Sequence, residues 1–320
     1  MSNENLRTAR KVKNDEFYTR YEDIEKELVK YKDQLCDKII YCNCDKPNSN
    51  FVKFFNDVKD KWGIKDVWHT SIDEGVSFDS DYAKELLTKC DVVITNPPFS
   101  KVRAEYLPML MDSGKQFLFI GNLNIATMKD IFPLIRDGKL WTGYTHPKEF
   151  LQPDGTYKKF GNTLWWTNMP VDKPLILNPD KKYYGNEDKY PHYDNYDAIN
   201  VDKIADIPSD YEGVMGVPVT FIEHYVPPIA DRGGIGSEYL VSEQEQTTKT
   251  SKLTDDITIC DTSLILDYNK NLRDRKREST SAEYSFKLIG HEHDLGNDEN
   301  IGQFEINGKG VYKRIILYRL

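Results

Sequence analysis

Apolar residues recur every three or four positions in five stretches of the first half of the chain, which is the spacing of one helix face. These predicted helices cover residues 21–35, 51–62, 81–89, 102–111 and 126–136. The second is the best marked, because Asn50 is a suitable N-cap and Gly63 a suitable stop. In the fourth, Pro108 is expected to kink or shorten the helix, since proline lacks a backbone N–H.

Short runs of apolar or β-forming residues separate these helices and predict strands. The runs cover residues 38–42, 66–70, 91–95, 116–121 and 163–167. Strands that alternate with helices indicate a doubly wound α/β sheet. Ligands of such sheets bind at the carboxyl ends of the strands, so polar residues that directly follow a strand are the first candidates for a site.

The pattern changes after about Pro170, where tyrosine, asparagine, aspartate and proline become dense and helical spacing fades. Residues 242–256 are polar and contain no aromatic side chain, which is typical of an exposed loop. Residues 284–320 alternate and are rich in β-forming residues. We therefore expect a domain over 1–170 that contains the sheet and a second, irregular α+β domain over 171–320.

Composition indicates the cellular compartment expected for this protein. Hydrophobic residues make up 39% of the 320 residues and charged residues 30%, which is compatible with a packed core in a soluble protein. The longest apolar run, 117–121, is far too short to span a bilayer, and residues 1–13 lack the apolar core of a signal peptide. Five scattered cysteines, an odd number, favour a reducing compartment with free thiols. We expect a cytoplasmic monomer with no membrane partner.

The net charge of −9 does not favour a nucleic-acid partner, because phosphate contacts require lysine and arginine. Basic residues nevertheless cluster in two places. These are Arg7, Arg10, Lys11 and Lys13 in one cluster, and Lys270, Arg273, Arg275, Lys276 and Arg277 in the other. Such clusters can form a DNA-binding face, and they are equally typical of solvated charge runs. Charge alone leaves the partner open.

The segment Asn96-Pro97-Pro98-Phe99 directly follows the strand predicted over 91–95. Each proline fixes its own φ and restricts the residue before it to extended conformations. The loop is therefore rigid. It presents one neutral amide, carbonyl oxygens in fixed directions and one aromatic ring at the carboxyl end of a strand.

These groups suit a planar base that carries an exocyclic amine. The amine can donate its two N–H bonds to the side-chain oxygen of Asn96 and the carbonyl of Pro97, which favours a nitrogen geometry ready to attack a methyl group. Phe99 can stack on the base once it is flipped out of the duplex. No strong base is needed, because the amine proton becomes acidic only after methylation. Elsewhere in a chain the tetrapeptide would be only a rigid turn, but between an apolar strand and a helix it favours methyl transfer.

Together with this loop, several other segments resemble the EcoRI-type adenine-N6 DNA methyltransferases. They follow one order over most of the chain, which is far more specific than the loop alone. The segments are Asp15-Glu16-Phe17-Tyr18-Thr19, Tyr41-Cys42-Asn43-Cys44-Asp45, Asp91 to Ser100, Tyr193 to Val201 and Gly213 to Pro218.

The resemblance implies a fold and a set of site residues. The fold is that of a methyltransferase dependent on S-adenosylmethionine (SAM), with a Rossmann-like doubly wound sheet and a C-terminal irregular α+β target-recognition domain. By the same resemblance, the SAM-binding residues are Phe17, Tyr18, Thr19, Cys42, Asn43 and Asp45. The catalytic residues are Asn96, Pro97, Pro98 and Phe99, and no metal is implied.

Two features depart from the usual pattern of SAM enzymes. The loop after the first strand contains no glycine, although its asparagines tolerate a positive φ better than most residues. The acidic residue that holds the cofactor ribose is expected between Asp73 and Asp81, and Ser77 stands at the position that is acidic in the family. The sequence does not choose among these candidates.

The resemblance implies methylation of adenine N6 at a specific site in duplex DNA, in the cytoplasm of a bacterial or phage-infected cell, as part of restriction-modification. Cytosine-N4 methylation is an alternative, since the same loop can present either amine. Methylation of a protein glutamine or an RNA base is a more distant one, because it needs no separate recognition domain. A catalytically silent DNA-binding module that kept the fold is the alternative from another class. The intact Asn96–Phe99 loop argues against it.

A few other residues suggest roles that a simpler interpretation also explains. Trp165 and Trp166 would line a base pocket or, as is commoner for paired tryptophans in a strand, belong to the core. Asn122 and Asn124 would shape the pocket or simply form a turn. The segments Cys42-x-Cys44 and His291-x-His293, even with Asp294, lack the further ligands that a zinc site needs.

Overall fold

The computed structural model describes residues 18–152, 155–173, 177–225, 286–291, 304–311 and 313–319. The chain divides into two compact units, each of which is described by itself. The described residues of the first unit are 18–123, 143–152 and 155–170, and the rest belong to the second. Phe17, the loop expected over 242–256 and both basic clusters lie outside the described residues.

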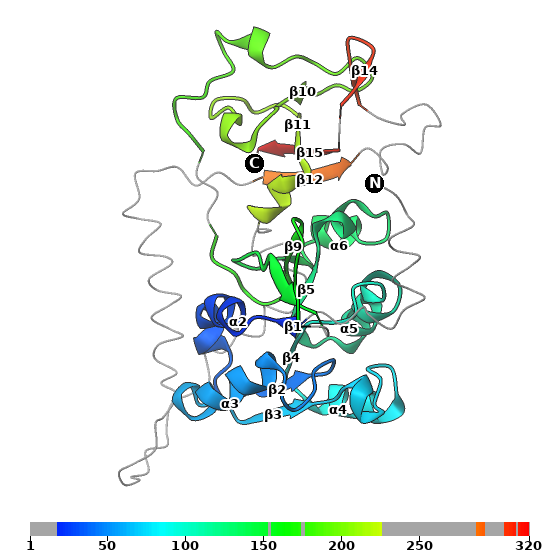
Figure 1. Cartoon of the computed structure of the whole chain (residues 1–320). Coiled ribbons are helices and arrows are strands. Elements are labelled where there is room, and N and C mark those ends of the chain that lie inside the picture. The colour runs from blue at the N-terminus through cyan, green and yellow to red at the C-terminus, as the bar shows by residue number, and fades with distance from the viewer. Residues whose placement is uncertain are drawn as a thin grey trace, which may run out of the picture. The chain divides into compact units, whose positions relative to one another are not determined.

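The first unit contains the predicted sheet. Five of its described strands lie side by side in the order β3-β2-β4-β5-β9 (Figure 1). Their bounds are Ile39–Cys42 (β2), Asp66–His69 (β3), Val92–Thr95 (β4), Gln116–Asn122 (β5) and Thr163–Thr167 (β9). Strands β3, β2, β4 and β5 are parallel, and β9 is antiparallel to β5. The expected mixed α/β architecture is therefore confirmed.

Helices cover both faces of this sheet. In Figure 1, α2 and α3 lie on one side of the strands and α4 and α5 on the other. Their bounds are Tyr21–Leu28 (α2), Asn50–Trp62 (α3), Asp81–Lys89 (α4) and Leu107–Ser113 (α5). Short 3-10 turns follow α2 at Val29–Gln34 (η1) and β3 at Ile72–Glu74 (η2).

The structure corrects several predicted helix boundaries. Ser49 rather than Asn50 is the N-cap of α3, because its hydroxyl accepts the Val52 N–H at 3.2 Å. Gly63 ends that helix as predicted, in the left-handed conformation. Pro108 lies in the first turn of α5, where a missing N–H costs least, and the π-helix η3 (Val102–Tyr106) precedes it.

A second, smaller sheet of the first unit joins distant parts of the sequence. It has the order β1-β7-β8, with β1 at Tyr18–Thr19, β7 at Glu149–Leu151 and β8 at Tyr157–Lys159. All its pairs are antiparallel, and Thr19 is in register with Phe150. The β7–β8 hairpin is thereby fixed beside the start of the described chain.

The core of the first unit is rich in aromatic side chains. Trp165 and Trp166 are fully buried in β9, so their assignment to the core is confirmed. A Cβ at Gly121 in the adjoining β5 would lie 2.8 Å from the Trp166 ring, so glycine is required for this close packing. Cys42, Cys44 and Cys90 carry free thiols, whereas Cys36 is disulfide-bonded, contrary to the expectation of free thiols throughout.

The second unit is more irregular than the first. A predicted helix over 126–136 is instead a 3-10 turn, η4 (Leu123–Thr127), followed by the short α6 (Phe132–Arg136) and β6 (Trp141–Thr142). A four-stranded sheet has the order β10-β11-β15-β12. Its strands are Ile199–Asn200 (β10), Met215–Pro218 (β11), Phe286–His291 (β12) and Arg314–Arg319 (β15).

Turns and a hairpin complete the described part of the second unit. The 3-10 turns are Glu187–Lys189 (η5), Ile204–Asp206 (η6) and Val219–Glu223 (η7), and the hairpin is Glu305–Ile306 (β13) with Lys309–Gly310 (β14). Tyr193, Ala198, Phe304 and Ile316 form a buried cluster there. Among the described residues, none of the helices has the length and apolar character needed to cross a bilayer.

Candidate active site

A pocket of the first unit lies where three neighbouring parallel strands end. Its walls come from β1, from the loops that follow β2 and β3, and from the loop that follows β4. The lining residues are Tyr18, Thr19, Asn43–Lys46, Ser49–Phe51, Ser71–Asp73, Val76–Phe78, Asn96–Phe99 and Lys101. This is the sheet edge at which ligands of such folds bind.

The pocket brings together most of the residues singled out in the sequence. Tyr18, Thr19, Asn43, Asp45 and the whole loop Asn96–Phe99 line it. Cys42 does not: it is the last residue of β2, and its side chain is fully buried in the sheet. Burial also raises the pKa of its thiol well above the ordinary value, so the neutral form is favoured.

Asp45 ties the loop after β2 to the loop after β4. Its carboxylate accepts hydrogen bonds from the Thr95 hydroxyl at 2.5 Å, from the Ser49 side chain and from the Asn96 backbone N–H. Burial raises the pKa of Asp45 to about 6, because desolvation of the charge outweighs these three hydrogen bonds. The start of the Asn96–Phe99 loop is therefore anchored to a buried carboxyl group.

Two lining residues have a buried polar atom that forms no hydrogen bond with the described residues. The Asn43 side-chain oxygen accepts the Tyr106 hydroxyl at 2.7 Å, but its amide nitrogen is buried without a hydrogen-bond partner among the described residues. The same is true of the Thr19 hydroxyl oxygen. Because a buried polar atom without a partner costs free energy, this arrangement fits a pocket whose polar ligand completes the hydrogen bonding.

The acidic residues that follow β3 differ in whether they line the pocket. Asp73 and Ser77 line the pocket, whereas Asp79 and Asp81 do not. The Asp73 carboxylate lies 3.5 Å from the Lys46 amine, which also donates a hydrogen bond to the Tyr18 hydroxyl at 2.9 Å. Nothing in the sequence singled out Lys46, because its contacts come from segments far along the chain.

Phe99 is held by two other rings. Its centroid lies 6.0 Å from that of Phe150 and 5.9 Å from that of Phe160, both nearly perpendicular, and the latter two rings are 5.6 Å apart. Phe150 and Phe160 belong to the β7–β8 hairpin and its end. No local signal in the sequence predicts this three-ring cluster, since Phe99 is about 50 to 60 positions before the other two rings.

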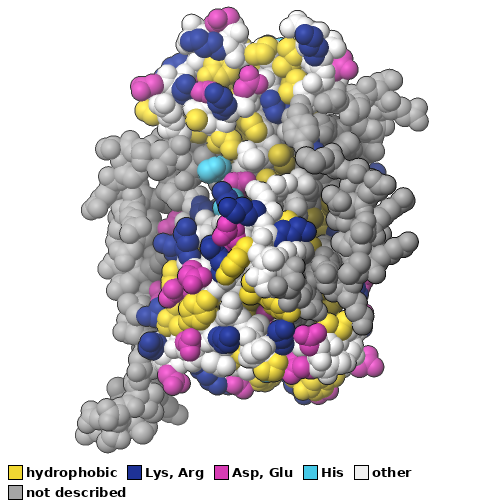
Figure 2. Space-filling model, in the orientation of Figure 1, with side chains coloured by type: hydrophobic (Ala, Val, Ile, Leu, Met, Phe, Trp, Pro, Cys, Tyr) yellow, Lys and Arg dark blue, Asp and Glu magenta, His cyan; other side chains and the backbone are white. Residues whose placement is uncertain are grey.

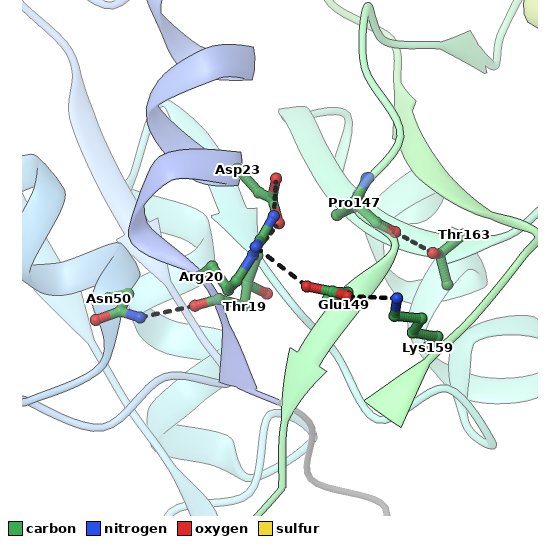
Figure 3. Close-up of polar contacts among 8 residues, drawn as sticks. All are labelled: Thr19, Arg20, Asp23, Asn50, Pro147, Glu149, Lys159 and Thr163. Carbon is green, nitrogen blue, oxygen red and sulfur yellow. Dashed lines mark hydrogen bonds and ion pairs between the residues drawn. The ribbon is translucent and has the colours of Figure 1, made fainter. Parts of the chain in front are cut away.

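Polar contacts fix the same hairpin against the end of β1, and β1 against α3 (Figure 3). Arg20 reaches Glu149 at 3.2 Å, and Glu149 also pairs with Lys159 at 3.0 Å. The Asn50 side chain, at the start of α3, donates to the Thr19 carbonyl at 2.8 Å. The strand that carries Tyr18 and Thr19 is thus held from both sides.

Other candidates lie away from this pocket. Asn122 ends β5, Asn124 belongs to the second unit, and neither lines the pocket. His291 ends β12, whereas His293 and Asp294 lie outside the described residues. Within the described ranges, no group of three or more His, Cys, Asp or Glu residues is arranged to hold a metal ion.

A mixed α/β sheet with an Asn-Pro-Pro-Phe loop at a pocket on its carboxyl edge fits the fold of a methyltransferase. The family model described as "Adenine-specific methyltransferase EcoRI" matches residues 5–75 and 56–319. The chain therefore belongs to this family, as its sequence motifs predicted.

Individual relatives agree with this assignment. The chain is 39% identical over 290 residues to the Type II methyltransferase M.EcoRI of Escherichia coli, which covers 71% of this chain and 87% of that protein. It is 34% identical over 261 residues to the Type II methyltransferase M.MpnI of Mycoplasma pneumoniae, covering 68% and 82%. No solved structure matches the chain significantly.

Proposed function

We propose that this protein is a SAM-dependent DNA methyltransferase that modifies N6 of adenine at a specific site in duplex DNA. The family is described as adenine-specific, and the relatives are named Type II methyltransferases. The observation that carries the proposal is the position of Asn96–Phe99 on the same pocket as Tyr18, Thr19 and Asn43. A methyl donor and a methyl acceptor must meet in one cavity, and this pocket offers groups for both.

The residues present fit SAM on chemical grounds. The buried Asn43 amide nitrogen is a donor suited to a carboxylate, and the Thr19 hydroxyl can donate or accept. Asp73 lines the same pocket and is suited to accept hydrogen bonds from ribose hydroxyls, which supports it as the acidic residue that holds the ribose. When bound, SAM supplies a methyl group attached to a positively charged sulfur.

The loop after β4 is proposed to hold the acceptor base. The Asn96 side-chain oxygen and the Pro97 carbonyl accept the two N–H bonds of the exocyclic amine, so its lone pair is directed at the methyl group. Phe99 stacks on the flipped base, and Phe150 and Phe160 keep that ring in place. Positioning of this kind lowers the barrier without a strong base in the ground state.

Asp45 has a supporting role in this proposal. Its carboxylate holds the Asn96 N–H and the Thr95 hydroxyl, so it fixes the backbone from which the Asn96 side chain projects. It also lines the pocket, where the sequence had assigned it to the cofactor. We propose that it positions the loop as well as bordering the cofactor.

The remaining parts of the proposal concern the second half of the chain and the cellular setting. Residues 171–320 would read the base edges of the target sequence, with a Rossmann-like catalytic unit over 1–170. The protein would act as a cytoplasmic monomer in restriction-modification.

The test is incubation of the protein with SAM and unmethylated genomic DNA, followed by nucleoside mass analysis and modified-base sequencing. N6-methyladenine at one sequence motif is the expected result. N4-methylcytosine would replace the proposed substrate with the alternative base. DNA binding without any methylated base would indicate a silent binding module.

A further inference from the structure

Side chains of the β7–β8 hairpin alternate between its two faces, so Lys158, paired with Phe150, shares the face of the aromatic cluster, and Lys159, paired with Glu149, lies on the other. Phe150 is fully buried, and Phe160 is half-buried against it. All three residues of β8 are exposed, with Tyr157 at 63%. Lys148, just before β7, is exposed as well.

The hairpin carries a small excess of positive charge. Residues 148–160 contain three lysines, Lys148, Lys158 and Lys159, and two carboxylates, Glu149 and Asp154, of which Asp154 lies outside the described residues. The Glu149 carboxylate is shared between Lys159 and Arg20, which also lower its pKa. This local excess contrasts with the charge of −9 of the whole chain, and Figure 2 shows basic and acidic side chains interspersed over the face that it draws.

One of these lysines, Lys158, is linked to the Asn96–Phe99 loop through the Phe160 ring. The Lys158 amine lies 5.1 Å from the centroid of the Phe160 ring, and that ring lies 5.9 Å from Phe99. A base stacked on Phe99 would bring its own sugar and phosphates with it. The hairpin therefore presents ammonium groups in the region where the backbone of the flipped nucleotide must run.

We propose that Lys148 and Lys158, on the face of the β7–β8 hairpin that also carries Phe150 and Phe160, bind DNA backbone phosphates beside the target base. This inference rests on the proposed function and names the surface by which the first unit holds the DNA strand. Lysine contacts to phosphate fix the position of a duplex without reading its sequence. The rings that brace Phe99 lie on the same face, so backbone binding and base stacking share one rigid element.

The test compares the double variant Lys148→Gln/Lys158→Gln with wild type in DNA binding over a range of salt concentrations. Each phosphate contact contributes about 0.9 to the slope of log affinity against log salt concentration. We therefore expect the slope to fall by roughly 1 to 2 in the double variant. The Kd for SAM should stay at the wild-type value, since neither lysine lines the pocket.

Two control variants separate phosphate binding from other effects. Lys148→Arg/Lys158→Arg keeps both charges and the cation near Phe160, so it should keep the wild-type slope. Lys61→Gln/Lys65→Gln removes two exposed lysines, one in the last turn of α3 and one just after the helix; Lys61 is roughly 16 Å along the helix from Asn50 at 1.5 Å per residue. It should also leave the slope unchanged.

An unchanged slope in Lys148→Gln/Lys158→Gln would overturn the proposal, as would an equal fall in Lys61→Gln/Lys65→Gln. If wild type methylates DNA but the slope does not respond to the hairpin lysines, only the hairpin proposal fails. A wild-type protein that neither binds nor methylates DNA would overturn both this inference and the proposed function.

Discussion

The Thr95 hydroxyl donates a hydrogen bond to the Asp45 carboxylate at 2.5 Å, and both side chains are buried. Thr95 is the last residue of β4, and Asp45 lies in the loop after β2. The Asn96 N–H donates to the same carboxylate. One acidic group thus joins the segment proposed to border the cofactor to the segment proposed to hold the base.

The first prediction concerns the pH dependence of methyl transfer. Because the pKa of Asp45 is raised to about 6, its carboxylate gains a proton as the pH falls through that value and loses acceptor capacity toward Asn96. We expect kcat of wild type to decline on the acid side near pH 6. Asp45→Asn should be slower at neutral pH and lack that decline, as measured with isotopically labelled SAM. If kcat of the variant shows the same decline near pH 6, the decline belongs to another titrating group.

The same carboxyl group predicts the pH dependence of stability. The unfolded chain releases this proton near pH 3.8, whereas the folded protein retains it until about pH 6. The folded state therefore binds more protons between these values, and wild type should lose stability relative to Asp45→Asn as the pH rises through this window. The change is roughly 3 kcal/mol by the usual conversion of a pKa shift. Urea unfolding at a series of pH values measures the free energy of unfolding of both proteins. If these free energies change with pH in the same way in wild type and Asp45→Asn, the prediction is wrong.

The second prediction concerns the amide of Asn96. Asn96→Ala should lower kcat by roughly 100- to 1000-fold, as for the loss of one oriented polar group in a transition state. DNA affinity should change little, because the amide is proposed to act on the reacting amine. Asn56→Ala, at an exposed position of α3, is the matched control. Single-turnover methylation and a DNA-binding titration measure the two effects, and equal rates for Asn96→Ala and wild type would remove the proposed role.

The third prediction concerns the ring cluster that holds Phe99. Phe160→Leu removes one of its edge-to-face partners, whose contribution is about 0.5–1.5 kcal/mol. We expect methyl transfer to slow by roughly 2- to 12-fold. The fluorescence of 2-aminopurine placed at the target base should report less flipped base. Phe160→Tyr keeps the ring and should restore both signals, whereas a defect of equal size in Phe160→Tyr would argue against ring packing as the cause.

The fourth prediction concerns the cofactor. Thr19→Val keeps the shape of the side chain but removes a buried hydroxyl that has no hydrogen-bond partner among the described residues. If SAM completes that hydrogen bond, the Kd for SAM should rise by about 2- to 12-fold, which corresponds to 0.5–1.5 kcal/mol. Calorimetric titration measures it, with Thr88→Val on the exposed side of α4 as control. An unchanged Kd would show that the hydroxyl does not contact the cofactor.

The sequence could predict elements whose signals are local. The helix predicted over 81–89 is α4, Asp81–Lys89, because its apolar spacing and its ends lie within the same few residues. Gly63 could be identified as the end of α3, since only glycine adopts that left-handed conformation without strain. The helix predicted over 126–136 was wrong in extent, because α6 covers only Phe132–Arg136 and a 3-10 turn covers Leu123–Thr127.

For the candidate site, the sequence alone determined the family and supplied the residues of the proposed chemistry, since Asn96–Phe99 is one contiguous rigid loop after a buried strand. Only the tertiary structure decided which distant residues join that loop. Asp45 anchors Asn96, Phe150 and Phe160 pack on Phe99, and Asp73 borders the pocket whereas Cys42 does not. The physical reason is that periodicity and turn chemistry act between neighbours in the chain, whereas these contacts depend on the pairing of strands far apart in sequence.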